Sequence, residues 1–273
     1  MHLYMRSFLL CPALMLLAAC ASPPEISPAY QYIQADDAPN YLLRLPEDYE
    51  GSNRRYPLLI FLHGIGEKGS GSEKAIQRVS LNGPFRSMRD GNWDTSLPLI
   101  VAGPQIGGMK WWWPTDQVAE YVQYLVNNYR VDRNRIYVTG VSMGGRAAWD
   151  LAEQYPQRAA AIIPAGAWAE DLSNDCASMR DIAVWAFHGT EDGLIKFRDG
   201  LKPVETLRDC DPSPRYAPSL TPLQGADHGN WQLVYDNQHG GSQVGADGET
   251  YEDIYRWLLT FSRDIDPQQD QED

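Results

Sequence analysis

The stretch of sequence that decides the fold is Thr139-Gly140-Val141-Ser142-Met143-Gly144-Gly145. The apolar run at 135–138 that leads into it is typical of a buried strand, and residues 146–152 favour a helix. Glycines on either side of a serine let strand and helix pass closely, so the hydroxyl stands clear of the sharp turn. The helix N-terminus also favours a developing negative charge. The pattern predicts a nucleophile at Ser142; a purely structural Gly-rich turn is the alternative.

Length and composition indicate one large α/β domain. The chain has 273 residues, of which 43% are hydrophobic and 22% charged, values typical of a soluble globular protein. Its formal net charge of −13 argues against nucleic acid as a partner, because phosphate binding needs clustered Lys and Arg. No His/Asp cluster has the spacing of metal ligands. We therefore expect neither a metal nor a cofactor, and we expect a monomer.

The N-terminus has the pattern of an export signal. Arg6 precedes an apolar segment over 8–19 that is too short for a stable membrane span. The segment ends Leu17-Ala18-Ala19-Cys20, which resembles the cleavage site of bacterial lipoproteins. The resemblance implies a signal peptide over 1–19, a lipidated Cys20, and a place on the periplasmic side of the cell envelope, at the outer membrane. An ordinary secretory signal with a chance cysteine is the alternative.

The remaining boundaries follow from composition. Residues 20–37, rich in Pro, Ser and Ala after the cysteine, predict a flexible tether to a domain over 38–263. Residues 264–273 form an acidic tail, for which we expect disorder. After export, Cys176 and Cys210 are an even pair in an oxidising compartment. We predict a disulfide between them; two buried free thiols are the alternative.

Apolar runs alternate with helical patterns along the domain. Strands are expected at 41–45, 57–62, 98–102, 135–138, 159–164, 182–187 and 220–223, and helices at 115–129, 146–152, 198–208 and 251–261. This alternation predicts a mostly parallel, doubly wound sheet in a single domain, flanked by helices. In such sheets the functional residues gather at the carboxyl ends of the strands.

Polar residues follow three of these expected strands. Ser142, Asp192 and His228 occur in that order, each in a loop after a strand. A serine nucleophile, a histidine base and an acid that orients the histidine form a catalytic triad. Glu191 is the alternative acid. His63 follows a strand but comes before the serine, so we assign it to its loop and not to the role of base.

Four segments carry a resemblance to a known family. They are Phe61-Leu62-His63-Gly64-x-Gly66-Glu67-x-Gly69, Arg135-Ile136-Tyr137-Val138-Thr139-Gly140-x-Ser142-Met143-Gly144-Gly145, Phe187-His188-Gly189-Thr190-x-Asp192 and His228-x-x-Trp231. They resemble the α/β-hydrolase esterases related to polyhydroxybutyrate depolymerases, feruloyl esterases and dienelactone-hydrolase-like predicted peptidases. The resemblance covers most of 40–262. Family members often carry Gly before this histidine, where Asp227 stands here.

The resemblance implies a carboxylic ester hydrolase of the α/β-hydrolase fold. It places the oxyanion hole at the backbone N–H groups of Ile65 and Met143. The substrate would be a small, phenolic or polymer-linked ester, with the membrane reached through the N-terminal lipid. Aromatic residues near strand ends suggest a substrate wall, with packing or a lid as the alternative; they are Trp111, Trp112, Trp113 and Trp231. Two other functions remain open: a serine peptidase of the same fold, and a catalytically silent lipoprotein that binds a sugar or cell-wall component.

Overall fold

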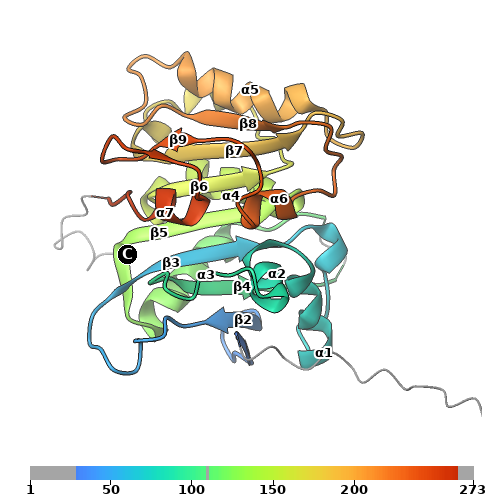
Figure 1. The fold of residues 1–273 in the computed structure, drawn as a ribbon, viewed down its shortest axis with the longest axis vertical. Helices are drawn as coiled ribbons and strands as arrows, with labels where there is room; N and C mark the ends of the chain where they lie inside the picture. Colours follow the sequence, from blue (N-terminus) through green and yellow to red (C-terminus); the bar gives the residue numbers. More distant parts are fainter. Residues whose placement is uncertain (1–28, 109–110, 264–273) are drawn as a thin grey trace, which may run out of the picture.

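The computed structural model describes residues 29–108 and 111–263, and its centre is an eight-stranded sheet. The strand order is β1-β2-β4-β3-β5-β6-β7-β8 (Figure 1). The strands are β1 (Gln31–Ile33), β2 (Tyr41–Arg44), β3 (Tyr56–Leu62), β4 (Ile100–Pro104), β5 (Val131–Val141), β6 (Ala161–Ala165), β7 (Ala183–Gly189) and β8 (Ser219–Leu223). A separate antiparallel pair joins β9 (Gln243–Val244) to β10 (Thr250–Tyr251).

Helices fill the connections. The α-helices are α1 (Glu73–Ile76), α2 (Gly83–Asp90), α3 (Thr115–Asn128), α4 (Met143–Gln154), α5 (Phe197–Arg208), α6 (Gln232–Tyr235) and α7 (Ile254–Leu258). Single 3₁₀ turns are η1 (Ile65–Glu67), η2 (Gln77–Leu81), η3 (Pro156–Arg158), η4 (Leu172–Asn174) and η5 (Met179–Asp181). The predicted closing helix over 251–261 is shorter than expected, because its first residue, Tyr251, pairs in β10 and Asp253 caps α7 by accepting from the N–H groups of Tyr255 and Arg256.

The predicted, mostly parallel sheet is confirmed. Neighbours from β4 through β3, β5, β6 and β7 to β8 all pair in parallel. Only the pairs β1–β2 and β2–β4, at one edge of the described sheet, are antiparallel. Since β1 lies within 20–37, the sheet begins inside the segment predicted as a tether, and that boundary is corrected: Tyr32 pairs with Leu42, and the Tyr32 hydroxyl donates to Gly71 O at 3.1 Å.

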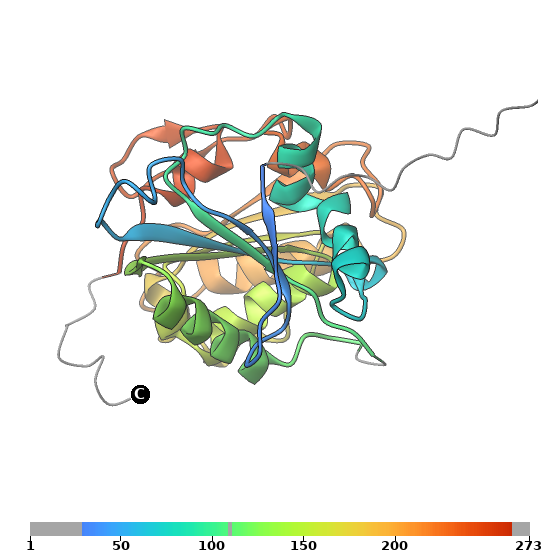
Figure 2. The ribbon, with the colours of Figure 1, turned by 90° about the horizontal axis from the view of Figure 1, so that it is seen from below.

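Each face of the sheet carries its own core. Along β3, Leu58 and Ile60 pack on one face and Leu59 and Phe61 on the other, and all four are fully buried. The first core includes side chains of α3, α4 and α5, and the second includes side chains of α2, α6 and α7. Figure 2 shows α3 and α4 on the face opposite α2 and α7. A strand covered on both faces explains why β3 is apolar at almost every position.

Close packing at the end of β3 fixes where α4 begins. A Cβ on Gly144 would lie 1.8 Å from Leu62 O, and one on Gly140 would lie 2.4 Å from the backbone of Gly144. No side chain fits at either position. The glycines of the motif therefore bring the start of α4 directly against the carboxyl ends of β3 and β5.

The predicted pairing of Cys176 with Cys210 agrees with the structure, where the two Sγ atoms lie 1.94 Å apart. The bond ties the segment after η4 to the end of α5. The signal peptide, Cys20, the first part of the tether and the acidic tail lie outside the described residues. Within 29–108 and 111–263, no helix combines the length and apolar character that crossing a bilayer requires.

Candidate active site

Ser142 occupies the turn between β5 and α4 in a backbone conformation that few residues adopt. Its φ is 52° and its ψ is −115°. A non-glycine residue with positive φ costs free energy, and the surrounding structure must enforce it. The Ser142 N–H donates to Ala165 O, and Ser142 O accepts from the Arg146 N–H, both at 2.9 Å. These bonds to β6 and α4 hold the turn, which presents the hydroxyl at the edge of the sheet.

The structure brings together the three side chains predicted as a triad. The Ser142 hydroxyl lies 2.9 Å from His228 Nε2, and His228 Nδ1 lies 2.7 Å from Asp192 Oδ2. Ser142 follows β5, Asp192 follows β7 and His228 follows β8. The ionised carboxylate of Asp192 accepts a hydrogen bond from Nδ1–H of His228. Nε2 is then unprotonated and can take the proton of the serine.

Asp192 is held as an anion by its surroundings. Burial alone would raise the pKa of this carboxyl, but hydrogen bonds from His228 and from the N–H groups of Ile195 and Leu194 outweigh burial and lower the pKa. The two backbone N–H groups donate to Oδ1 at 2.8 and 2.9 Å, so Oδ2 is left for His228. Glu191, the alternative acid, is exposed to solvent.

Ile65 and Met143, assigned to the oxyanion hole, lie at the starts of η1 and α4. Both line the same cavity as Ser142. The first turn of a helix leaves N–H groups without intrahelical partners, and at Met143 this turn directly follows the nucleophile. Their N–H groups are therefore available for an oxygen that develops negative charge beside Ser142.

His63 anchors the loop that carries Ile65. Its ring is fully buried, with Nδ1 donating to Gly64 O at 2.6 Å and Nε2 accepting from the Ile106 N–H at 3.1 Å. Trp113 packs edge-on against this ring and donates from Nε1 to His63 O at 3.1 Å. Burial lowers the pKa of His63 to about 4, so the ring is neutral at pH 7. As predicted, His63 belongs to its loop.

A cavity of about 370 Å³ opens beside Ser142. It is lined by Ile65, Trp111, Trp112, Ser142, Met143, Arg146, Trp168, Leu194 and Ile195. Trp111 and Trp112, both predicted to contact substrate, are each 67% exposed at its wall.

Two of the predicted wall residues lie elsewhere. Trp113 is buried under the His63 loop and lines a second cavity that shares Trp112, Arg146 and Trp168 with the first. Trp231 packs edge-on against the ring of His228, with ring centres 5.0 Å apart. Neither lines the Ser142 cavity; Trp113 contacts the ring of His63 and Trp231 contacts the ring of His228.

Four lining residues were missed in the sequence. Arg146 had a usable signal, because it follows Ser142 by four positions and thus lies on the same helix face. Leu194 and Ile195 follow Asp192, and only the turn that wraps this acid brings them to the cavity. Trp168 enters through the loop after β6, which carried no motif.

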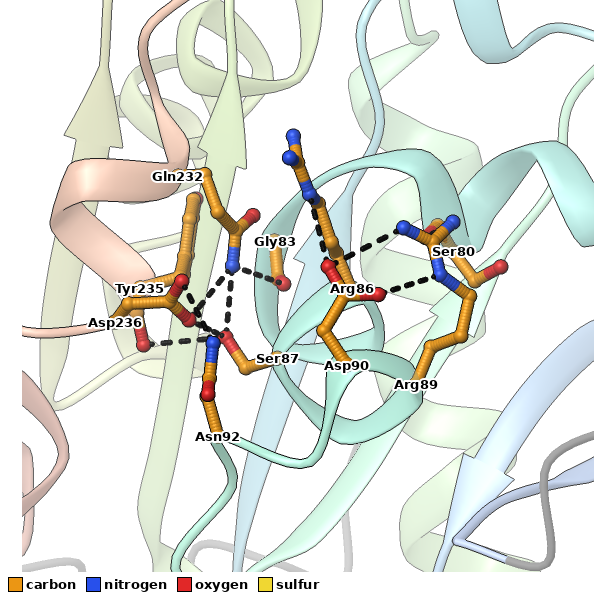
Figure 3. Close-up of polar contacts among 10 residues, drawn as sticks. All are labelled: Ser80, Gly83, Arg86, Ser87, Arg89, Asp90, Asn92, Gln232, Tyr235 and Asp236. Carbon is orange, nitrogen blue, oxygen red and sulfur yellow. Dashed lines mark hydrogen bonds and ion pairs between the residues drawn. The ribbon is translucent and has the colours of Figure 1, made fainter.

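A polar network fixes α6, the helix that directly follows His228 and Trp231. Gln232 Nε2 donates to Ser87 Oγ at 2.8 Å and to Asp236 Oδ1 at 2.9 Å. The Ser87 hydroxyl donates to the same Asp236 oxygen at 2.6 Å, and Asn92 donates to Asp236 Oδ2 at 3.2 Å. Figure 3 shows the side chains of Ser87, Asn92, Gln232 and Asp236 pointing toward one another. The network joins the histidine loop to α2.

The side chains around Ser142 are those that nucleophilic catalysis by a serine requires. Across 29–108 and 111–263, no three His, Cys, Asp or Glu side chains are grouped so as to hold a metal ion. The polar groups around Ser142 instead suit nucleophilic attack, proton transfer and stabilisation of an oxyanion.

Comparison with solved structures shows the fold. A thermostable esterase superposes with a TM-score of 0.61 at 24% identity, over 87% of this chain and 64% of that chain. A feruloyl esterase module from Clostridium thermocellum gives 0.59 at 15% identity, over 87% of this chain and 91% of that one. The chain has the α/β-hydrolase fold. The predicted fold and the predicted resemblance to esterases of this fold are thereby confirmed, whereas the resemblance to a lipoprotein signal concerns residues outside the described part of the chain.

Sequence comparisons agree with this fold. Residues 35–167 match the family model described as putative esterase. A bifunctional acetylxylan esterase/xylanase of Neocallimastix patriciarum is 23% identical over 186 residues, which cover 65% of this chain and 25% of that protein. An esterase of Mycobacterium tuberculosis is 27% identical over 131 residues, 43% of this chain and 26% of that protein. The chain spans about a quarter of the length of these relatives. The family model and both relatives are described as esterases.

Proposed function

We propose that this α/β-hydrolase cleaves carboxylic esters through an acyl-enzyme formed on Ser142. The observation that carries the proposal is the geometry of His228, whose ring nitrogens lie 2.9 Å from Ser142 Oγ and 2.7 Å from Asp192 Oδ2. The match to the putative esterase family and the likeness to acetylxylan and feruloyl esterases support the same reaction. The substrate is a small, phenolic or polymer-linked ester.

In this mechanism His228 takes the Ser142 proton as Oγ attacks the acyl carbon, and the carbonyl oxygen becomes an oxyanion. The N–H groups of Ile65 and Met143 stabilise that charge. His228 then returns the proton to the departing alcohol oxygen, which leaves the acyl group on Ser142. Water activated by His228 attacks the acyl carbon in turn, and the acid product and the serine hydroxyl are released. Asp192 stabilises the imidazolium of His228 in both acylation and deacylation.

The decisive experiment compares the wild type with Ser142→Ala on p-nitrophenyl esters from acetyl to long acyl chains. We expect wild-type turnover to fall by at least roughly 10⁴-fold in the variant, because the nucleophile is lost. The acyl chain of the ester that is cleaved fastest would indicate how long an acyl group the cavity accommodates. Absence of turnover on every ester in the folded wild type would refute the proposal. Peptide cleavage would then indicate a serine peptidase, and failure of a fluorophosphonate probe to label Ser142 would indicate a silent binding protein.

We also propose that the protein is exported and anchored by lipid at Cys20, on the periplasmic side of the envelope. The segment Leu17-Ala18-Ala19-Cys20 supports this proposal, and so does the Cys176–Cys210 pair, since disulfides persist in oxidising compartments. Radiolabelled palmitate should enter the wild type expressed in a bacterial host and should not enter Cys20→Ser. Equal labelling of the two would exclude this anchor.

A further inference from the structure

Arg146 provides the one charged side chain among the described residues that line the Ser142 cavity. It lies on α4 four residues after the nucleophile, so about 6 Å along the helix axis separates them. Its side chain is only 17% exposed. A guanidinium cannot lose its proton in a protein, and it presents donors in a rigid plane. The cavity is otherwise apolar apart from Ser142, and the Arg146 guanidinium is a fixed hydrogen-bond donor one helical turn away from Ser142.

Two carboxylates balance the charge of this guanidinium and use part of its donor set. Arg146 Nε donates to Asp150 Oδ1 at 2.6 Å, and Nη1 donates to Glu170 Oε1 at 2.8 Å. The guanidinium carbon lies 5.6 Å from the ring centre of Trp168, which lines the same cavity. Nη2 has no hydrogen-bond or ion-pair partner within the described part of the chain. Nη2 can therefore donate a directional hydrogen bond. The cluster of Arg146, Asp150 and Glu170 holds one positive and two negative charges, so it does not attract anions.

The cavity lies on the acyl side of the site. In the proposed ester hydrolysis the departing alcohol oxygen must receive its proton from His228 Nε2, so the alcohol lies next to that ring. Among the described residues that line the cavity, neither His228 nor Trp231 occurs, whereas Ile65 and Met143 of the oxyanion hole do. The space beside Ser142 therefore receives the acyl group.

We propose that Arg146 determines acyl specificity by donating a hydrogen bond from Nη2 to an uncharged oxygen at the far end of a flat, apolar acyl group. The indole rings of Trp111, Trp112 and Trp168 supply flat apolar walls for such a group. A carboxylate at the same place would meet Asp150 and Glu170, which already neutralise the arginine. A hydroxyl, ether or carbonyl oxygen meets no such repulsion. This inference rests on the proposed function.

The test compares three methyl esters that share one leaving group: cinnamate, 4-methoxycinnamate and 4-carboxycinnamate. For the wild type we expect kcat/KM to be roughly tenfold higher on 4-methoxycinnamate than on cinnamate, since a hydrogen bond from a charged donor is worth about that factor. In Arg146→Met this ratio should fall to about one. Arg198→Met removes an arginine whose side chain is 81% exposed on α5, and it should keep the wild-type ratio.

A second variant tests the charge balance without disturbing the core. Glu170 is 70% exposed, so Glu170→Gln removes one negative charge at little risk to folding. We expect this variant to raise kcat/KM on 4-carboxycinnamate, relative to 4-methoxycinnamate, by about threefold. The inference is overturned if the wild type favours the 4-carboxy ester, or if it does not favour the 4-methoxy ester over cinnamate.

A methoxy preference that persists in a folded Arg146→Met would also overturn the inference, and so would an unchanged ratio in Glu170→Gln. A wild type that cleaves p-nitrophenyl acetate but none of the cinnamates would overturn it and leave the proposed function standing. Failure on every ester would overturn the proposed function itself.

Discussion

His188 Nε2 lies 3.3 Å from Asp192 Oδ2, and both side chains are completely buried. The same Nε2 lies 2.9 Å from Ile195 O, and the Ile195 N–H donates to Asp192 Oδ1 at 2.8 Å. His188 therefore donates into the turn that wraps the acid, and its contacts hold Asp192 in position. The buried position of His188 beside the triad is thus explained by its hydrogen bonds to the turn after β7.

Asp192→Asn should lower kcat by roughly 10³- to 10⁴-fold, because an amide no longer holds the proton of His228 on Nδ1. The matched control is Glu191→Gln, which alters the exposed neighbouring acid and should keep kcat within about twofold of wild type. Steady-state kinetics on one p-nitrophenyl ester measures both. A larger loss in Glu191→Gln than in Asp192→Asn would make Glu191 the acid.

The buried imidazole of His63 should make stability depend on pH. Burial lowers its pKa from 6.5 to about 4, so between these values the unfolded chain binds the proton and the folded protein does not. The contribution of the neutral ring is complete above about pH 6.5 and is lost as the pH falls toward 4, by up to roughly 3 kcal/mol.

The measurement for His63 is urea unfolding at a series of pH values between 4 and 7. His63→Gln retains an acceptor for Ile106 N–H and a donor for Gly64 O but does not titrate. Its free energy of unfolding should fall less steeply with decreasing pH than that of the wild type. Parallel curves for the two proteins would contradict the assignment of a neutral, buried His63.

Ser87→Ala should loosen α6 and the histidine loop that precedes it. The hydroxyl is fully buried and bonds both Gln232 and Asp236, so its loss should cost about 1–2 kcal/mol of stability. We expect kcat to fall about three- to tenfold with KM little changed, because His228 is positioned less well relative to Ser142.

Arg86→Gln is the control for Ser87→Ala. Arg86 is the preceding residue of α2, and its ion pair with Asp90 lies at the surface, so the change should cost less than about 0.5 kcal/mol. Equal kcat values for the wild type and Ser87→Ala would show that the network only stabilises the fold.

Gly144→Ala should prevent the close approach of α4 to β3. The added Cβ would lie 1.8 Å from Leu62 O and 2.4 Å from Leu62 C, and backbone atoms cannot rotate away. We expect a loss of at least about 3 kcal/mol, measured by thermal unfolding. Gly66→Ala is the matched control, since a Cβ there would meet nothing within 4 Å. A Gly144→Ala protein as stable as Gly66→Ala would show that the helix can move aside.

The sequence predicted an element well where the local pattern of apolar residues or glycines matches how those residues are buried and packed in the structure. The apolar run of β3 packs into both cores, and the glycines beside Ser142 are required by contacts with Leu62. Strand β1 and helices α1 and α2 were missed because each is short, with four residues in α1 and eight in α2. Strand β1 is only three residues long and is held by its pairing with β2.

By itself, the sequence determined the parallel sheet, the place of Ser142 at a strand-to-helix turn, and the order of Ser142, Asp192 and His228. Those features depend on local periodicity and on glycines, which neighbouring residues along the chain specify. Only the tertiary structure decided that Trp113 packs against His63 and Trp231 against His228, and that Trp168 lines the cavity. The direction of a side chain at a loop depends on contacts between residues far apart in sequence, and no local pattern records them.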